Sequence, residues 1–295
     1  MKETLEGRLK NLIKLFVKDK ALLRSAGLFY EDVKYFVLFF LRYPVEYAVY
    51  RYSLLAGKPY FGLVMQAWMT IPERAAWMRK AVAAVKGGGP VNILEIGCWA
   101  GHSATVWAGA LKEFHAGRGR LVCVDPWKSY ISLEKHDTSR FMYRQMEAGL
   151  KSGDILRLFF HNIRSAGAEE LVLTVRAESR EALKYLATDS FDIIYVDGDH
   201  SYDGVMSDLR LSAPLLKDGG FLCGDDLELQ YGQVDKAAIE PVKNLNFATD
   251  PAQETGYHPG VTLALWKFFG ADVSAYNGFW LMRKTGPAWE KVTLG

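Results

Sequence analysis

The sequence contains few cysteines, and their placement narrows the possible chemistry. Only three occur in 295 residues, and no two form a C-x-x-C pair, which argues against both a disulfide framework and a zinc site. Cys98, Cys123 and Cys223 each lie in or just after a stretch expected to form a buried strand. We therefore expect packing roles for the three thiols and a reducing, cytoplasmic location.

Long apolar runs, a secretory leader and a strong net charge are also missing. The longest apolar run, residues 35–41, is far too short to span a membrane. The opening residues, MKETLEGRLK, have no apolar core followed by a cleavage site, so no secretory signal is expected. A net charge of +2 is too balanced to suggest a nucleic-acid partner. The chain is predicted to be an ordinary globular protein.

The first part of the chain differs from the rest in composition. Residues 1–60 carry 11 Lys and Arg against 6 Asp and Glu and are rich in aromatic side chains. The run Gly-Gly-Gly-Pro at 87–90 breaks the chain. We predict a helical region at 1–88 that serves as a lid or as a homo-oligomer interface, and a second domain at 89–295. A solvated helix face explains the basic residues most simply, with weak contact to an anionic membrane surface as the alternative.

Residues 191–226 are predicted to form a strand, an acidic loop, a helix and a second strand that ends in an acidic pair. The apolar run at 191–196 suits a strand buried on both faces. The helix is expected to begin near Ser201, to continue through Leu216 with Pro214 bending its last turn, and to end in a turn at 217–220. A strand at 221–223 then follows.

Three carboxylates follow these two strands, Asp197 after the first and Asp225 and Asp226 after the second. A right-handed crossover makes the strands parallel, so the acids meet at one edge of the sheet, where open α/β sheets bind ligands. Carboxylates that converge repel one another unless they are protonated, splayed or neutralised. We predict neutralisation by a hard divalent cation. The alternative is that the three acids only cap loops and form turns.

A second strand, turn and helix lies at residues 91–114. The turn has the spacing Glu95-x-Gly97-x-x-x-Gly101, with Ser103 opening the helix. These glycines are farther apart than in the dinucleotide fingerprint G-x-G-x-x-G. The segment resembles motif I of the class I S-adenosylmethionine-dependent methyltransferases.

That resemblance assigns the cofactor site. Asp125, at the end of the next strand, resembles the family's acceptor for the ribose hydroxyls, because a carboxylate can accept two hydrogen bonds from a vicinal diol. Trp127 is predicted either to cover the adenine or the substrate, or to be a plain surface aromatic. Glu178 and Ser179 resemble the adenine-contacting loop. The implied cofactor-binding residues are Glu95, Gly97, Gly101, Ser103, Asp125, Glu178 and Ser179.

The acidic pattern resembles the metal-dependent O-methyltransferases of the macrocin and novobiocin sugar-modifying group, and more distantly the catechol group. The resemblance implies that Asp197, Asp225 and Asp226 hold a divalent cation, most readily Mg²⁺. The catechol enzymes usually have lysine three places after the first metal acid, where this chain has His200. His200 is a candidate general base, with Asp199 as its competitor, and a cap or strut is the other explanation for His200.

The predicted fold is α/β, a doubly wound, seven-stranded, Rossmann-like methyltransferase sheet with an N-terminal helical appendage. Residues 227–257 are expected to be an insertion that either closes over substrate or decorates the fold. The predicted function is metal-assisted transfer of a methyl group from S-adenosylmethionine to a hydroxyl of a sugar or polyhydroxylated natural product. The alternatives are a catechol-type small aromatic acceptor and a non-catalytic cofactor-binding scaffold.

Overall fold

The computed structural model describes residues 40–129 and 140–295. The first predicted basic helix and part of the aromatic segment lie outside this range. Residues 40–56 are helical, and within the described chain no helix is long and apolar enough to cross a membrane.

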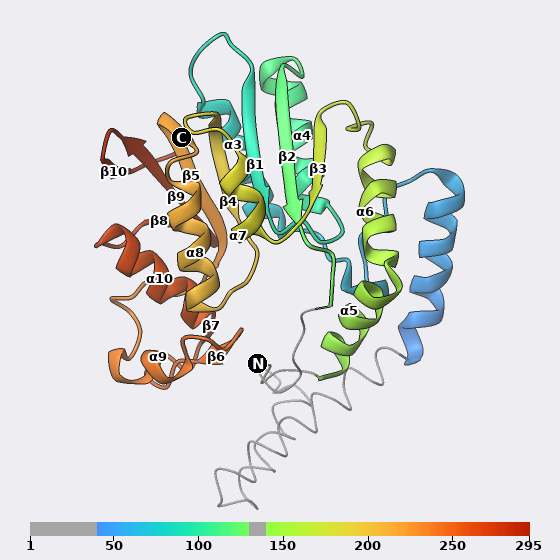
Figure 1. Cartoon of the computed structure of the whole chain (residues 1–295). Helices are drawn as coiled ribbons and strands as arrows, with labels where there is room; N and C mark the ends of the chain where they lie inside the picture. The colour runs from blue at the N-terminus through green and yellow to red at the C-terminus, as the bar shows by residue number, and fades with distance from the viewer. Residues whose placement is uncertain (1–39, 130–139) are drawn as a thin grey trace, which may run out of the picture.

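A mixed sheet forms the centre of the molecule, with strand order β10-β9-β5-β4-β1-β2-β3 and β8 paired to β9 (Figure 1). Strands β1 to β5 run parallel, and β9 is antiparallel to β5. The main-sheet strands are β1 (Val91–Ile96), β2 (Gly119–Asp125), β3 (Val172–Arg176), β4 (Phe191–Val196), β5 (Leu216–Leu227), β8 (Ser274–Tyr276), β9 (Gly278–Thr285) and β10 (Ala288–Lys291). The doubly wound α/β fold is confirmed. The described sheet has eight strands rather than seven, since β10 adds a final hairpin.

Helices cover both faces of this sheet. One face packs against α3 (Pro72–Ala84), α4 (His102–His115) and α6 (Asp154–Ser165), and the other against α7 (Ser179–Ala182), α8 (Tyr202–Ser212) and α10 (Pro259–Phe269). Neighbouring strand residues alternate between the two cores: Ile93 belongs to the first and Leu94 to the second. Burial on both faces explains why these strands are continuous apolar runs. Shorter elements are η1 (Val64–Gln66), α5 (Arg140–Ser152), η2 (Leu183–Tyr185), α9 (Lys236–Val242), β6 (Ala248–Thr249) and β7 (Gly256–Tyr257).

The helix and strand around Pro214 differ from the prediction. Helix α8 starts after Ser201, whose side chain accepts a hydrogen bond from the Gly204 amide as predicted for a cap, but it ends at Ser212. Ala213 still has helical backbone angles, but Pro214 has no N–H to donate to the next helical carbonyl, so the hydrogen-bond ladder stops before Pro214 and the helix does not continue through a bend. Strand β5 then begins at Leu216, which pairs with Phe191, and the register shifts before Ile193 pairs with Phe221. The predicted turn at 217–220 is therefore absorbed into the irregular start of β5.

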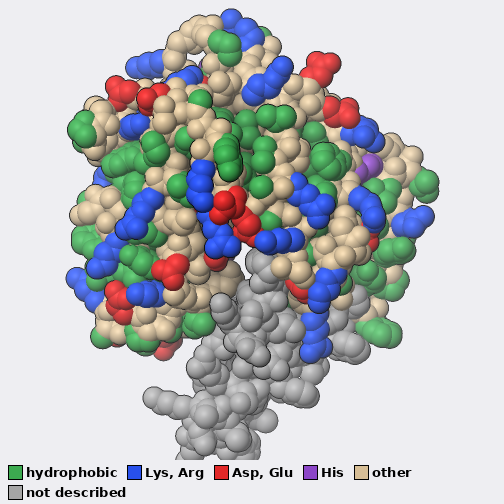
Figure 2. Space-filling view, viewed as in Figure 1, with side chains coloured by type: hydrophobic (Ala, Val, Ile, Leu, Met, Phe, Trp, Pro, Cys, Tyr) green, Lys and Arg blue, Asp and Glu red, His purple; other side chains and the backbone are tan. Residues whose placement is uncertain are grey.

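The predicted insertion after Asp226 is structured. It contains α9 and the short β6–β7 hairpin, and its core packs Leu229, Val234, Ile239 and Tyr257 against Leu263 of α10. On the face seen in Figure 2, Lys and Arg side chains are interspersed with Asp and Glu rather than gathered into one large patch.

Candidate active site

A large cavity opens where the parallel strands end. Its volume is about 1310 Å³, above the roughly 300–1,000 Å³ of common ligand sites, so it has room for two molecules. Its walls come from the loops after β1, β2, β4 and β5, from residues 66–71, from α5 and from residues 244–249. The insertion thus supplies part of the wall. The predicted site residues that line the cavity are Gly97, Gly101, Ser103, Asp125, Glu178, Ser179, Asp197, Asp199, His200, Asp225 and Asp226.

Two glycines shape the loop after β1. Gly97 has φ of +83°, and a Cβ there would lie 2.0 Å from the carbonyl oxygen of Asp197. Gly101 has φ of +85°, and a Cβ there would lie 2.8 Å from the ring of Phe159. Only glycine tolerates both the positive φ and the close contact. The loop can therefore lie against the loop after β4, joining the predicted cofactor motif to the first acid.

Glu95 lies behind this loop rather than among the cavity-lining residues of the described chain. Its side chain is fully buried and accepts hydrogen bonds from the Ser103 hydroxyl and from Sγ of Cys123 (3.6 Å). Burial raises the pKa of Glu95 to about 8, although the Ser103 hydrogen bond opposes the rise. Glu95 therefore holds the start of α4 in place through its hydrogen bond with Ser103.

Asp125 holds the same loop from the end of β2. Its carboxylate accepts hydrogen bonds from the amides of Cys98 (2.9 Å), Trp99 (3.1 Å) and Trp127 (2.7 Å). Burial nevertheless raises its pKa, because the loss of hydration outweighs these three hydrogen bonds.

Trp127 follows neither of its predicted roles. The side chain is 1% exposed, packs against Phe159, and donates a hydrogen bond to the carbonyl of Trp99. It is a core residue beneath the loop after β1, neither a surface aromatic nor part of the described cavity wall.

The loop after β3 places Glu178 and Ser179 at the cavity, where both already have protein partners. Glu178 forms an ion pair with Lys128, and the Ser179 hydroxyl donates to Asp208 at 2.6 Å. Burial raises the pKa of Asp208 to about 7.

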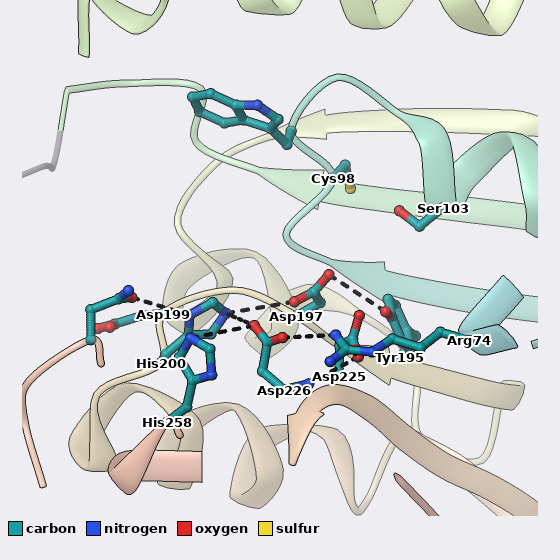
Figure 3. Close-up of polar contacts among 12 residues, drawn as sticks. Arg74, Cys98, Ser103, Tyr195, Asp197, Asp199, His200, Asp225, Asp226 and His258 are labelled. Carbon is teal, nitrogen blue, oxygen red and sulfur yellow. Dashed lines mark hydrogen bonds and ion pairs between the residues drawn. The ribbon is translucent and has the colours of Figure 1, made fainter. Parts of the chain in front are cut away.

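The three predicted metal acids gather at the ends of β4 and β5, but a basic side chain lies among them (Figure 3). Nη1 of Arg74, from α3, is 2.6 Å from Oδ1 of Asp225 and 2.8 Å from Oδ1 of Asp226. A register shift in β5 between Gly224 and Leu227, with a φ of +63° at Asp226, sets this acidic pair apart from the regular ladder. Arg74 therefore supplies positive charge where the sequence suggested a metal ion.

Two histidines complete the cluster. Nε2 of His200 is 3.6 Å from Oδ1 of Asp197 and 3.3 Å from Oδ2 of Asp226, and Nε2 of His258 is 3.8 Å from that second oxygen. Burial alone would lower the pKa of His200, but the contacts with Asp197 and Asp226 raise it to about 10. His200 is then protonated at neutral pH in this arrangement, which is unfavourable for a general base.

Asp199 mainly organises its own loop. Its Oδ1 accepts from the Ser201 amide (2.9 Å) and its Oδ2 from the Ser201 hydroxyl (2.8 Å). These hydrogen bonds form the entry to α8.

Sequence reasoning missed four members of the cluster: Arg74, Glu228, Asn246 and His258. Of these four residues, only His258 had a local sequence signal, because it precedes the Pro-Gly pair that opens α10. Arg74 lies in an ordinary helix start, 151 residues before Asp225. Nothing local in the sequence pairs the two.

One protein-family model matches the central part of the chain. Residues 94–227 match the model of a methyltransferase domain. The matched segment comprises 134 of the 295 residues. It contains the loop after β1, Asp125 and the three predicted metal acids, while Arg74 and His258 lie outside it. No curated protein matches the chain.

Several solved structures resemble the chain at low identity. The O-methyltransferase NovP is 16% identical, with a TM-score of 0.51 over 75% of this chain and 86% of its own. The O-methyltransferase TomG from Streptomyces achromogenes is 20% identical (TM-score 0.46; 74% and 82% covered), and an O-methyltransferase from Bacillus cereus is 17% identical (TM-score 0.43; 80% and 88%). The likeness to NovP supports the fold.

Proposed function

We propose that the protein transfers a methyl group from S-adenosylmethionine to a hydroxyl of a sugar or polyhydroxylated natural product. The observation that carries the proposal is a single cavity that joins the glycine loop after β1 and Asp125 to the charged cluster after β4 and β5. The methyltransferase domain match supports methyl transfer, and NovP, which shares the fold, is an O-methyltransferase.

When bound, the cofactor supplies a methyl group on a sulfonium. The chain would hold it with the loop from Gly97 to Gly101, whose glycines leave the backbone open to the cavity, and with the Asp125 carboxylate for the ribose diol. Glu178 and Ser179, which line the same cavity, would contact the adenine. Their present partners, Lys128 and Asp208, fix the two side chains in position.

A magnesium ion held by Asp197, Asp225 and Asp226 does not fit the observed arrangement. Mg²⁺ requires near-octahedral oxygen ligands at about 2.1 Å. The Arg74 guanidinium already contacts the facing oxygens of Asp225 and Asp226. The proposed reaction therefore has no step that passes through such an ion.

Asp197 is the proton acceptor that the geometry favours. It lines the cavity directly after β4, and its closest side-chain partners among the described residues are distant, the Tyr195 hydroxyl at 3.5 Å and His200 at 3.6 Å. Both oxygens of Asp199, in contrast, are engaged by Ser201. In the proposed reaction the acceptor oxygen forms the new C–O bond, its proton passes to Asp197, and the electrons of the broken C–S bond return to sulfur.

The test is methyl transfer by the purified full chain with a panel of glycosides and catechols, followed as S-adenosylhomocysteine formation. We expect turnover with a hydroxylated glycoside and a fall of about 10²- to 10⁴-fold for Asp197→Asn, with calorimetric cofactor binding unchanged. Turnover with catechols alone would support the catechol alternative. Cofactor binding without turnover on any acceptor would support the scaffold alternative, and no cofactor binding would overturn the proposal.

A further inference from the structure

Three side chains in the charged cluster point their ligand atoms at one place. Nε2 of His200 lies 3.3 Å and Nε2 of His258 3.8 Å from the same oxygen, Oδ2 of Asp226. One ligand atom from each of the three residues lies within 4.8 Å of the others. They come from the loop after β4, from the end of β5 and from the residue that precedes α10, and all three line the cavity (Figure 3).

Hydrogen bonds hold both imidazoles by their other nitrogen. Nδ1 of His200 is 3.1 Å from Oδ1 of Asn246, and Nδ1 of His258 is 3.1 and 3.2 Å from the Glu228 oxygens. The Asn246 amide is itself oriented, because its Nδ2 donates to the Tyr143 hydroxyl. Since both partners of Nδ1 are acceptors, each Nδ1 carries a hydrogen, and Nε2 is the nitrogen left for a metal ion. Nε2 of His200 binds a metal ion only after it has released the proton that it holds in this arrangement. Metal-binding histidines have this kind of anchoring.

Arg74 divides the acids into two sets. Its Nη1 binds Oδ1 of Asp225 and Oδ1 of Asp226, whereas Oδ2 of Asp226 faces the histidines. The Arg74 guanidinium therefore lies against the oxygens of Asp225 and Asp226 that a metal ion bound by all three acids would need. A set of two imidazoles and one carboxylate remains beside it.

The spacing of this second set suits a metal ion. Two ligands at about 2.1 Å from a metal are about 3.4 Å apart at a tetrahedral angle and about 3.0 Å apart at a right angle. The 3.3 Å distance between His200 and Asp226 fits these values. The 3.8 Å distance between His258 and Asp226 needs to shorten by a few tenths of an ångström. Nε2 of His200 is also shielded from solvent, and it faces the carboxylates of Asp197 and Asp226 at 3.6 and 3.3 Å, as a ligand to a shared cation would.

We propose that His200, Asp226 and His258 form a divalent-metal site that takes a borderline transition ion such as Zn²⁺ or Co²⁺ in preference to Mg²⁺. Imidazole ligands suit transition ions, while Mg²⁺ prefers oxygen. The shortage of cysteine argues only against thiolate zinc sites and leaves this one open. All three side chains line the cavity, so an acceptor hydroxyl bound there would lie beside the ion. This last role rests on the proposed function, whereas the metal site itself does not.

The test uses the metal alone on the full-length chain. After chelator treatment, Co²⁺ is titrated and its visible d–d absorption recorded, without cofactor or acceptor. We expect one equivalent to bind, Zn²⁺ to displace it, and millimolar Mg²⁺ to leave the spectrum unchanged. Absence of the bands, or displacement of Co²⁺ by Mg²⁺ at equal concentration, would overturn the site.

Two variants separate this site from a three-acid site, and Asp226 is common to both. His258→Ala should weaken Co²⁺ binding at least 10- to 100-fold, while Asp225→Asn should leave it within about threefold. The reverse pattern would support the three-acid site and overturn ours. His200→Ala repeats the test if His258→Ala fails to fold, as judged by circular dichroism. Metal binding without methyl transfer would overturn the proposed function alone.

Discussion

At the scale of single residues, the charge balance of the site depends on a small number of buried acidic and basic side chains. Asp225 and Asp226 share one guanidinium, yet their pKa values move in opposite directions. Burial and the charges of Asp226 and Asp197 raise the pKa of Asp225 to about 7. Burial would also raise that of Asp226, but the nearby His200, His258 and Arg74 lower it to about 2. Asp226 is therefore the permanently charged member of the pair.

Replacing Arg74 should be costly because it leaves buried carboxylates unpaired. The side chains of Arg74 and Asp225 are only 11% and 10% exposed. We expect Arg74→Met to lower the free energy of unfolding at pH 7 by about 3–5 kcal/mol, measured by urea denaturation. Arg79→Met, on the same helix, removes an exposed pair with Glu113 and should cost at most about 1 kcal/mol. Equal effects of the two variants would contradict the assignment.

Glu95 should make stability depend on pH. Its folded pKa of about 8 lies above the ordinary value of 4.5, so the folded state holds the proton more tightly than the unfolded state. The stability gained from this proton is fully present below pH 4.5 and is lost as the pH rises through 8. Since one pKa unit corresponds to about 1.4 kcal/mol, the loss should amount to a few kcal/mol.

Glu95→Gln isolates this contribution from the other titrating groups. The difference in unfolding free energy between wild type and variant should shift in favour of the variant between pH 5 and pH 9, as measured by urea denaturation at each pH. A difference that stays constant over this range would show that Glu95 is ionised in the folded protein.

At the scale of elements, the loop after β1 depends on glycine at one point. Gly97→Ala places a Cβ against the Asp197 carbonyl at positive φ and should cost more than about 2 kcal/mol of stability and weaken cofactor binding. Gly109 lies within α4 with nothing within 4 Å of its Cβ position, so Gly109→Ala should stabilise by about 0.5–1 kcal/mol. Thermal melts and cofactor titration of the two variants test the contrast. A Gly97→Ala protein as stable as wild type would remove the proposed contact between the two loops.

Sequence reasoning located these elements well because their signals are local. The strand at 91–96 and the helix cap at Ser201 follow from neighbouring residues, and both are observed as predicted. The ends of α8 and β5 were misjudged because the pair Gly219-Gly220 signals a turn, whereas strand pairing to Phe191 decides the backbone there. Element boundaries therefore failed where a distant strand outweighed local preference.

At the scale of the whole molecule, the site joins segments that no local pattern connects. The predicted acids, glycines and Asp125 were brought to one cavity, since parallel strands end at one edge of the sheet. Arg74, Asn246 and His258 reach it from α3, the insertion and the start of α10. Their contribution depends on tertiary packing, so a single sequence predicted the cavity but not the charge balance inside it. The division at residue 88 and the N-terminal interface stay predictions.

The helix at 40–56 offers the surface on which the predicted homo-oligomer interface can be tested. Leu41, Val45 and Val49 are spaced one turn apart and are 72%, 65% and 48% exposed, an apolar stripe of the kind found at protein interfaces. If the full chain is a dimer, glutamate at all three positions should shift its light-scattering mass to that of the monomer. Tyr185→Glu, at an isolated apolar residue that is 87% exposed, should leave the mass unchanged.

A triple variant that remains dimeric would exclude this stripe from the interface. A monomeric wild type would instead favour the lid as the role of the N-terminal region.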